Sequence, residues 1–136
     1  LERLIKAAKF EEFLAKKWSS EKRFGLEGCE VLIPAMNTIF DTISAKGVEK
    51  VIMGLAHRGR LNVLANITKK PLEEIFSLFD SKWIPLNKIT GDVKYHLGIE
   101  TEVVNETTNK KMEMIVIDNP SHLEAVNPVV LGKARS

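Results

Sequence analysis

The chain has 136 residues, of which 44% are apolar and 28% are charged, a composition typical of a soluble globular domain and not of a disordered segment. The formal net charge is only +2, with Lys and Arg interleaved among Glu and Asp, so the sequence does not support a nucleic-acid partner. The single cysteine, Cys29, excludes an intrachain disulfide, and no apolar stretch approaches the length of a membrane span.

The N-terminal part of the chain predicts two helices. From Leu1 to Trp18, apolar residues recur at three- and four-residue steps with Lys and Glu between them, the pattern of an amphipathic helix. A second helix is predicted from about Val31 to Ala45, and Pro34 fits its first turn, where a missing N–H costs little. We expect residues 1–22 to form an N-terminal helical segment and residues 23–136 to form an α/β domain.

The middle of the chain predicts a strand followed by helices. Val51 to Leu55 is short and continuously apolar, which is typical of a strand buried on both faces of a parallel sheet. Helical spacing returns from Arg60 to Lys69, and Pro71 opens another helix that runs to about Phe79. Trp83 to Asp92 has no period and is predicted to be a loop. This order predicts an α/β fold with a mostly parallel sheet flanked by helices.

The C-terminal part predicts a β-hairpin and a further helix. Tyr95 to Val104 and Lys111 to Asp118 are rich in β-branched residues and flank a polar run, which favours a hairpin. Ser121 and Glu124 have the spacing of a capping box, so we expect a helix to begin there. Pro128 is then expected to kink or interrupt that helix.

The two ends suggest a piece of a longer protein. The sequence begins at Leu1 without a methionine and stops at Ser136 inside an expected helix. No targeting segment is visible, and a missing N-terminus would remove one.

Three segments carry residues suited to chemistry. His57-Arg58-Gly59-Arg60 follows the predicted strand, at the edge where open α/β sheets bind ligands, and its two guanidinium groups and imidazole suit an anion. His96 could donate a hydrogen bond to a carboxylate or move a proton near neutral pH. Ser121 and its neighbours lie at a predicted helix N-terminus, which attracts phosphate or carboxylate groups.

Each segment also has a purely structural interpretation. The arginines could pair with nearby carboxylates in a solvated turn, a lone histidine is more often structural than catalytic, and Ser121 could serve only as a cap. The three histidines lack the close pairs typical of zinc sites, and the chain has no Walker A loop, G-x-G-x-x-G or G-x-S-x-G motif. We therefore predict no metal site within this chain.

Four motifs considered together are more informative than any of them alone. In chain order they are Phe24-Gly25-Leu26-Glu27-Gly28-Cys29-Glu30, His57-Arg58-Gly59-Arg60-Leu61-Asn62-Val63-Leu64, Gly91-Asp92-Val93-Lys94-Tyr95-His96-Leu97-Gly98 and Asn119-Pro120-Ser121-His122-Leu123-Glu124-Ala125. In order and spacing they resemble the decarboxylating first components of 2-oxo acid dehydrogenase complexes, in particular those that act on 2-oxoglutarate.

This resemblance implies roles for individual residues. Residues 23–136 would be the incomplete, pyrophosphate-side part of a domain that binds thiamine diphosphate and continues beyond Ser136. His57 and His96 would be catalytic residues that also bind the substrate, and Ser121 would reach both substrate and cofactor. The cofactor would be contacted by Arg58, Ser121 and Leu123.

The resemblance also implies a cofactor metal and partners. The family's Mg²⁺ motif, Gly-Asp followed by Asn, is expected outside this chain, and Gly91-Asp92 is not its counterpart. The expected partners are 2-oxoglutarate, a lipoyl-bearing succinyltransferase, dihydrolipoyl dehydrogenase and a second copy of the parent chain. The sequence around Gly28-Cys29-Glu30 favours the mitochondrial matrix, with the bacterial cytoplasm as the alternative.

Two other functions stay open at this stage. One is the related 2-oxoadipate enzyme, whose substrate is one methylene longer, a difference that is weak in binding energy. The other is a non-catalytic assembly module in which the basic turns bind partner carboxylates and Trp83 anchors an interface. We expect the 136-residue chain alone to be inactive, whether the whole protein acts on 2-oxoglutarate or on 2-oxoadipate.

Overall fold

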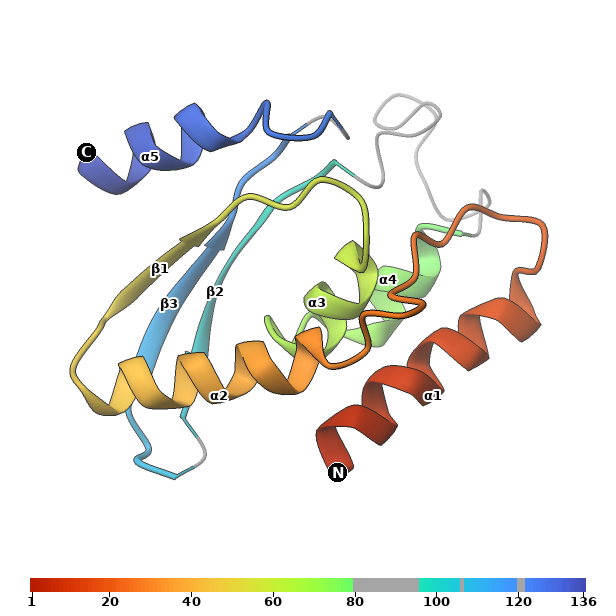
Figure 1. Ribbon diagram of the computed structural model, residues 1–136, viewed down its shortest axis with the longest axis horizontal. Coiled ribbons are helices and arrows are strands. Elements are labelled where there is room, and N and C mark those ends of the chain that lie inside the picture. The colour runs from red at the N-terminus through yellow and green to blue at the C-terminus, as the bar shows by residue number, and fades with distance from the viewer. Residues whose placement is uncertain (80–95, 106, 120–121) are drawn as a thin grey trace.

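The computed structural model describes residues 1–79, 96–105, 107–119 and 122–136. These residues form helices α1 (Glu2–Lys17), α2 (Leu32–Ala45), α3 (Arg60–Asn66), α4 (Leu72–Ser77) and α5 (Asn127–Arg135), and strands β1 (Lys50–Met53), β2 (Ile99–Val104) and β3 (Lys111–Val116). In Figure 1, α1 and α5 lie at opposite sides of the molecule, with the sheet and the other helices between them. The predicted loop from Trp83 to Asp92 lies outside the described residues.

The N-terminal helix is confirmed, and its sequence explains its packing. Ala7 and Leu14 are both 1% exposed and point from α1 toward α2 and α3. On the opposite face, Glu12 pairs with Lys9 at 2.6 Å and with Lys16 at 2.9 Å. Helix α1 therefore buries one apolar stripe and exposes its opposite face to solvent, as its periodicity predicts.

The sheet confirms the hairpin but differs from the predicted sheet in its strand directions. The strand order is β1-β3-β2; β3 is parallel to β1 and antiparallel to β2. Among the described strands, one of the two pairings is therefore parallel, and a mostly parallel sheet is not observed. Val51, Ile52 and Met53 are half-buried and not fully buried, because β1 is an edge strand of the described sheet.

The inner face of β3 forms the centre of the core. Met112, Met114 and Val116 are each at most 3% exposed. They alternate along the strand, so all three face the same side of the sheet. Their buried partners come from α1, α2, α3 and its C-cap, α4 and the segment before α2: Ala7, Leu14, Leu26, Ile33, Leu61, Val63, Leu64, Ile67 and Ile75.

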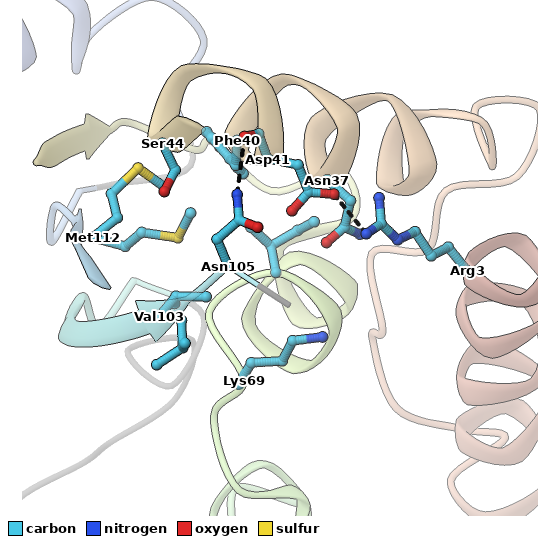
Figure 2. A pocket seen from close by; sticks show the side chains of 12 residues that line it. Arg3, Asn37, Phe40, Asp41, Ser44, Lys69, Val103, Asn105 and Met112 are labelled. Carbon is cyan, nitrogen blue, oxygen red and sulfur yellow. Dashed lines mark hydrogen bonds and ion pairs between the residues drawn. The ribbon is translucent and has the colours of Figure 1, made fainter. Parts of the chain in front are cut away.

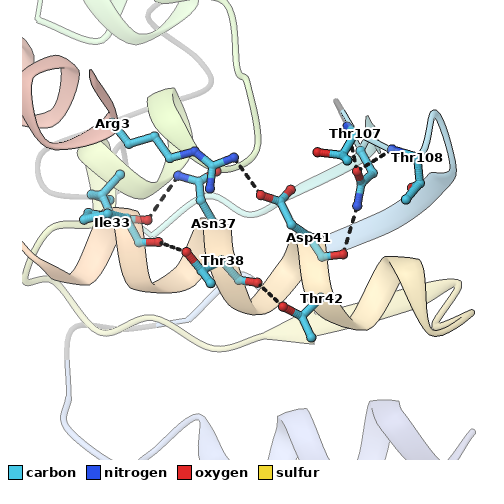
Figure 3. A network of polar contacts seen from close by, with 10 residues as sticks. Arg3, Ile33, Asn37, Thr38, Asp41, Thr42, Thr107 and Thr108 are labelled. Carbon is cyan, nitrogen blue, oxygen red and sulfur yellow. Dashed lines mark hydrogen bonds and ion pairs between the residues drawn. The ribbon is translucent and has the colours of Figure 1, made fainter. Parts of the chain in front are cut away.

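The hairpin turn is joined to α2 and, through it, to α1. Asn105 Oδ1 accepts hydrogen bonds from the backbone N–H groups of Thr107 and Thr108, both at 2.9 Å, in an Asx-type turn. Asn105 Nδ2 donates to the Asp41 carbonyl at 2.9 Å, and the Asp41 carboxylate pairs with Arg3 at 2.6 Å (Figure 3). These contacts fix the hairpin turn against α2, at the edge of the sheet where β1 and β3 begin.

The predicted helix start at Ser121 and Glu124 is wrong. Glu124 has φ +66°, and α5 begins only at Asn127, while Ser121 lies outside the described residues. The expected kink at Pro128 is also wrong, because this proline lies in the first turn of α5, where its fixed φ is suited to a helix and its missing N–H breaks no bond. The proline therefore marks the start of the helix.

Candidate functional site

The topology brings the first of the three predicted segments, and the described parts of the other two, to one edge of the sheet. Since β1 and β3 are parallel, the turn containing His57 and the segment from residue 117 leave the same edge. Strand β2 runs the other way and begins there, with Ile99 opposite Val116, so His96 lies at this edge too. This edge, where β1 and β3 end and β2 begins, is the candidate site (Figure 1). Such edges are where open α/β sheets bind ligands.

Arg60 lies buried beneath this edge. It is 0% exposed, and its guanidinium donates to oxygens from each of the converging segments: Leu55 O at 2.6 Å, Leu97 O at 2.8 Å, Asn119 Oδ1 at 3.0 Å, and His96 O and Ile117 O both at 3.3 Å. Burial lowers the pKa of Arg60, and the Asp118 carboxylate opposes this shift. The prediction that both guanidiniums of the basic turn face an anion is thus wrong for Arg60, which binds backbone carbonyls.

Asn119 completes this arrangement. It is 6% exposed, its Nδ2 donates to Leu55 O at 2.8 Å, and its backbone N–H donates to His96 O at 3.1 Å. Leu55 O therefore accepts from both Arg60 and Asn119. The sequence motifs assign neither residue this role. An Asn directly before a proline at the end of a strand was a usable signal, but nothing in the sequence indicated that Arg60 turns inward.

The turn that carries His57 and Arg58 has a conformation that requires glycine. Gly59 has φ +70°, and its N–H donates to Phe24 O at 2.6 Å. A Cβ at this position would overlap the buried Leu26 side chain. Half-buried His57 packs its ring 5.3 Å from that of Phe24, while Arg58 is exposed. The turn thus presents one imidazole and one guanidinium at the sheet edge.

The segment that carries His96 reaches the same edge just before β2. His96 is half-buried and lies in a turn, so the strand predicted from Tyr95 to Val104 does not include His96, and Tyr95 lies outside the described residues. Gly98 follows, with its N–H bonded to the Asp118 carboxylate and no room for a Cβ against the Val116 carbonyl. This close approach fixes the path of the chain from His96 into the sheet.

The remaining predicted site residues lie after β3. Leu123 is 74% exposed in a turn, so its side chain is available to a ligand or to another part of the protein. Ser121, predicted to contact both substrate and cofactor, lies outside the described residues. The structure therefore brings His57, Arg58 and His96 to one edge and leaves Leu123 exposed in the segment that follows it.

A small cavity lies at the opposite edge of the sheet and is distinct from the candidate site. It encloses about 30 Å³, with room for roughly one water molecule, and residues from α1, α2 and the hairpin line it (Figure 2). Ser44, 2% exposed, also lines it, and the Ser44 hydroxyl has no hydrogen-bond partner in the described part of the chain. Its lining includes none of His57, Arg58, His96 and Leu123.

The described residues hold neither a cluster suited to a metal ion nor a helix suited to span a membrane. No group of three or more His, Cys, Asp or Glu side chains among them is arranged to hold a metal ion. No helix in this part of the chain combines the length and apolar character needed to span a membrane.

Comparison with known proteins gives a consistent result. Residues 2–136 match the protein family described as "Dehydrogenase E1 component". The chain is 58% identical over 136 residues to "2-oxoglutarate dehydrogenase-like, mitochondrial" of Rattus norvegicus, covering 100% of this chain and 14% of that protein. It is 58% identical over 134 residues to "2-oxoglutarate dehydrogenase, mitochondrial" of Caenorhabditis elegans, covering 98% of this chain and 13% of that protein. The chain thus spans about one seventh of the length of these curated relatives.

Proposed function

The chain belongs to the dehydrogenase E1 component family, and on that basis we propose that the whole protein oxidatively decarboxylates 2-oxoglutarate with thiamine diphosphate. The succinyl group would pass to a lipoyl group of a partner acyltransferase. The observation that carries the proposal is that His57, Arg58 and His96 lie at one edge of the sheet. They do so in a chain that is 58% identical to a protein named "2-oxoglutarate dehydrogenase, mitochondrial". The names of these relatives do not favour the alternative in which the substrate is 2-oxoadipate.

The charges at the candidate site suit this substrate and this cofactor. The substrate is a dicarboxylate and the cofactor carries a diphosphate, so both need cations or N–H donors around them. We assign His57 and His96 to binding the substrate and to its chemistry, and Ser121 to both ligands. Exposed Arg58 would contact the cofactor, together with Ser121 and Leu123. When bound, the cofactor supplies the carbanion chemistry, while the protein positions and polarises the substrate.

The cellular setting and the partners belong to the same proposal. We place the whole protein in the mitochondrial matrix, as a homodimer that works with a succinyltransferase and dihydrolipoyl dehydrogenase. The mitochondrial relatives at 58% identity support this location. The residues that would hold Mg²⁺ are expected outside these 136 residues.

The test uses the full-length protein with thiamine diphosphate and Mg²⁺. We expect His57→Ala and His96→Ala each to lower kcat/KM for 2-oxoglutarate by about 100-fold or more, the scale of losing a positioned acid–base or polar group. Glu102→Gln is the control, because Glu102 lies on β2 with an exposed side chain paired to Lys111. We expect its activity to match that of the wild type.

Two results would contradict the proposal. A higher kcat/KM for 2-oxoadipate than for 2-oxoglutarate would assign the protein to the other substrate. If both histidine variants decarboxylated normally while assembly with the acyltransferase failed, the sheet edge would be an assembly surface and not an active site.

A further inference from the structure

Arg60 is placed where it cannot touch a ligand but can affect both histidines. Its side chain is 0% exposed, and the carbonyls it binds belong to Leu55, His96, Leu97 and Ile117. Leu55 lies two residues before His57, and His96 is itself one of the acceptors. One guanidinium therefore joins the backbone on both sides of the candidate site.

A buried arginine destabilises a protein unless its N–H groups donate hydrogen bonds to several acceptors. Desolvating a guanidinium costs free energy that an apolar side chain would not. Carbonyls at strand ends, however, lack ladder partners and need donors. Arg60 supplies a planar fork that reaches diverging segments, which the single ammonium of a lysine cannot do. The Arg60 Nε–H group is buried without a hydrogen-bond partner among the described residues, so the side chain is held by its two terminal nitrogens.

Asn119 adds a second connection between the same segments. Its Oδ1 accepts from Arg60 at 3.0 Å, its Nδ2 donates to Leu55 O at 2.8 Å and its backbone N–H donates to His96 O at 3.1 Å. Together the two side chains cross-link the ends of β1 and β3 to the start of β2.

We propose that Arg60 and Asn119 are positioning residues that set the placement of His57 relative to His96 for the reaction. This inference rests on the function proposed above. The two side chains act through the backbone carbonyls that they bind and touch neither substrate nor cofactor. Because misplacing a reacting group by about 1 Å can cost about 100-fold in rate, such cross-links affect catalysis directly.

The first test is Arg60→Lys in the full-length, cofactor-loaded enzyme. Lysine keeps the positive charge but cannot bridge the carbonyls of both sides. We expect kcat per cofactor-loaded site to fall at least about tenfold, with KM for 2-oxoglutarate changing less than about threefold. We also expect faster amide hydrogen exchange in peptides covering residues 54–60 and 96–99, measured by mass spectrometry without substrate.

Asn62→Ala is the matched control, because Asn62 is a buried polar residue of the same helix. It is 2% exposed, donates to Ala7 O at 3.1 Å and to the Glu11 carboxylate at 2.7 Å, and accepts from Asn66 at 2.7 Å. It therefore holds α3 to α1, and these hydrogen bonds within the described part of the chain do not reach Leu55, His96 or Ile117. We expect a lower melting temperature with kcat per loaded site within about twofold of the wild type. This separates loss of stability from loss of positioning.

Asn119→Ala keeps the test decisive if Arg60→Lys does not fold. It leaves the carbonyl contacts of Arg60 and the backbone N–H donation of residue 119 to His96 O in place, and it removes the side-chain contacts of Asn119 with Arg60 and with Leu55 O. A fall in its kcat per loaded site of at least about threefold supports the proposal. Wild-type kcat in either folded variant overturns the proposal, and failure of both variants to fold also overturns it, because the pair would then serve stability alone.

His57→Ala, assayed in parallel, distinguishes failure of this inference from failure of the proposed function. Normal turnover in that variant rejects the proposed function itself.

Discussion

Two glycines with similar backbone angles show how differently the same residue type can matter. Gly59 has φ +70° and Gly28 has φ +82°, a region that residues with a Cβ rarely adopt. Their surroundings differ, because a Cβ at residue 59 would overlap the buried side chain of Leu26, whereas a Cβ at residue 28 would meet nothing within 4 Å. Only Gly59 therefore combines a special conformation with tight packing, and it supports the turn that carries His57.

We predict that Gly59→Ala is clearly more destabilising than Gly28→Ala. The left-handed conformation costs each variant about 1–2 kcal/mol, and the overlap with Leu26 adds about 1–3 kcal/mol only at Gly59. The melting temperatures of the two full-length variants provide the measurement. Equal melting temperatures would show that Leu26 can move aside without cost.

Helix α1 depends on charges as well as on its apolar stripe. Hydrogen bonds from Lys9 and Lys16, reinforced by their charges, lower the pKa of Glu12 to about 2. A carboxylate whose pKa is lowered in the helix stabilises that helix above the pKa it has in the unfolded chain. The stabilisation is lost as the pH falls through the folded-state value. For Glu12 the loss occurs from the ordinary value of 4.5 down to about 2.

We predict that a synthetic peptide of residues 1–18, capped at both ends, loses helicity between pH 5 and pH 2. Circular dichroism measures this change, and 1 M salt at pH 7 should reduce helicity as well, because salt screens exposed ion pairs. In a Glu12→Gln peptide both responses should be smaller. Helicity that is independent of both pH and salt would mean that the ion pairs of α1 contribute nothing outside the folded protein.

Helix α5 contacts the sheet through a close approach at Gly54. A Cβ there would lie 2.7 Å from Val126 Cγ1 and 2.7 Å from Val130 Cγ2, so a larger residue fits only if these side chains or the helix move. Most of the helix surface is exposed, including Val129 at 54% and Leu131 at 66%. The docking of α5 therefore depends on a few contacts beside the candidate site.

We predict that Gly54→Ala moves α5 away from β1. Amide hydrogen exchange in a peptide covering residues 124–136 of the full-length protein should become faster, because the overlap with the two valines must be relieved. Adding Val130→Ala should restore part of the protection by removing one of the clashing methyl groups, a coupling expected only between residues in contact. If the double variant exchanged faster than Gly54→Ala alone, the contact would not limit the docking of α5.

Local sequence patterns predicted most elements correctly and failed where distant segments decide the outcome. The helix from Leu1 to Trp18 and the hairpin can be predicted, because the apolar period and the turn residues depend only on nearby sequence. The capping box at Ser121 was misleading, because Pro128 makes Asn127 the better helix start. The burial of Arg60 cannot be predicted from the sequence, since its acceptors lie 5 to 59 residues away in the chain and come together only in the folded sheet.

At the scale of the whole molecule, the described fold is a small three-stranded sheet packed against helices, with the candidate site at one edge. That edge supplies two imidazoles and an exposed guanidinium, each held by segments that Arg60 and Asn119 join. The chain spans only 13–14% of the length of its curated relatives. The cofactor and its metal, in our proposal, need ligands that lie in the rest of that length.

We therefore predict that the 136-residue chain alone, given thiamine diphosphate and Mg²⁺, does not reduce an artificial electron acceptor when 2-oxoglutarate is added. Under the proposed function this edge supplies only part of the groups that hold and activate the two ligands, and missing transition-state contacts cost orders of magnitude in rate. The full-length protein in the same assay is the positive control and should turn over. Cofactor binding by the short chain, followed by calorimetry, adds a second measurement, and we expect it to be far weaker than in the full-length protein. Turnover by the short chain at a rate comparable to the full-length protein would mean that this single sheet edge carries the whole active site.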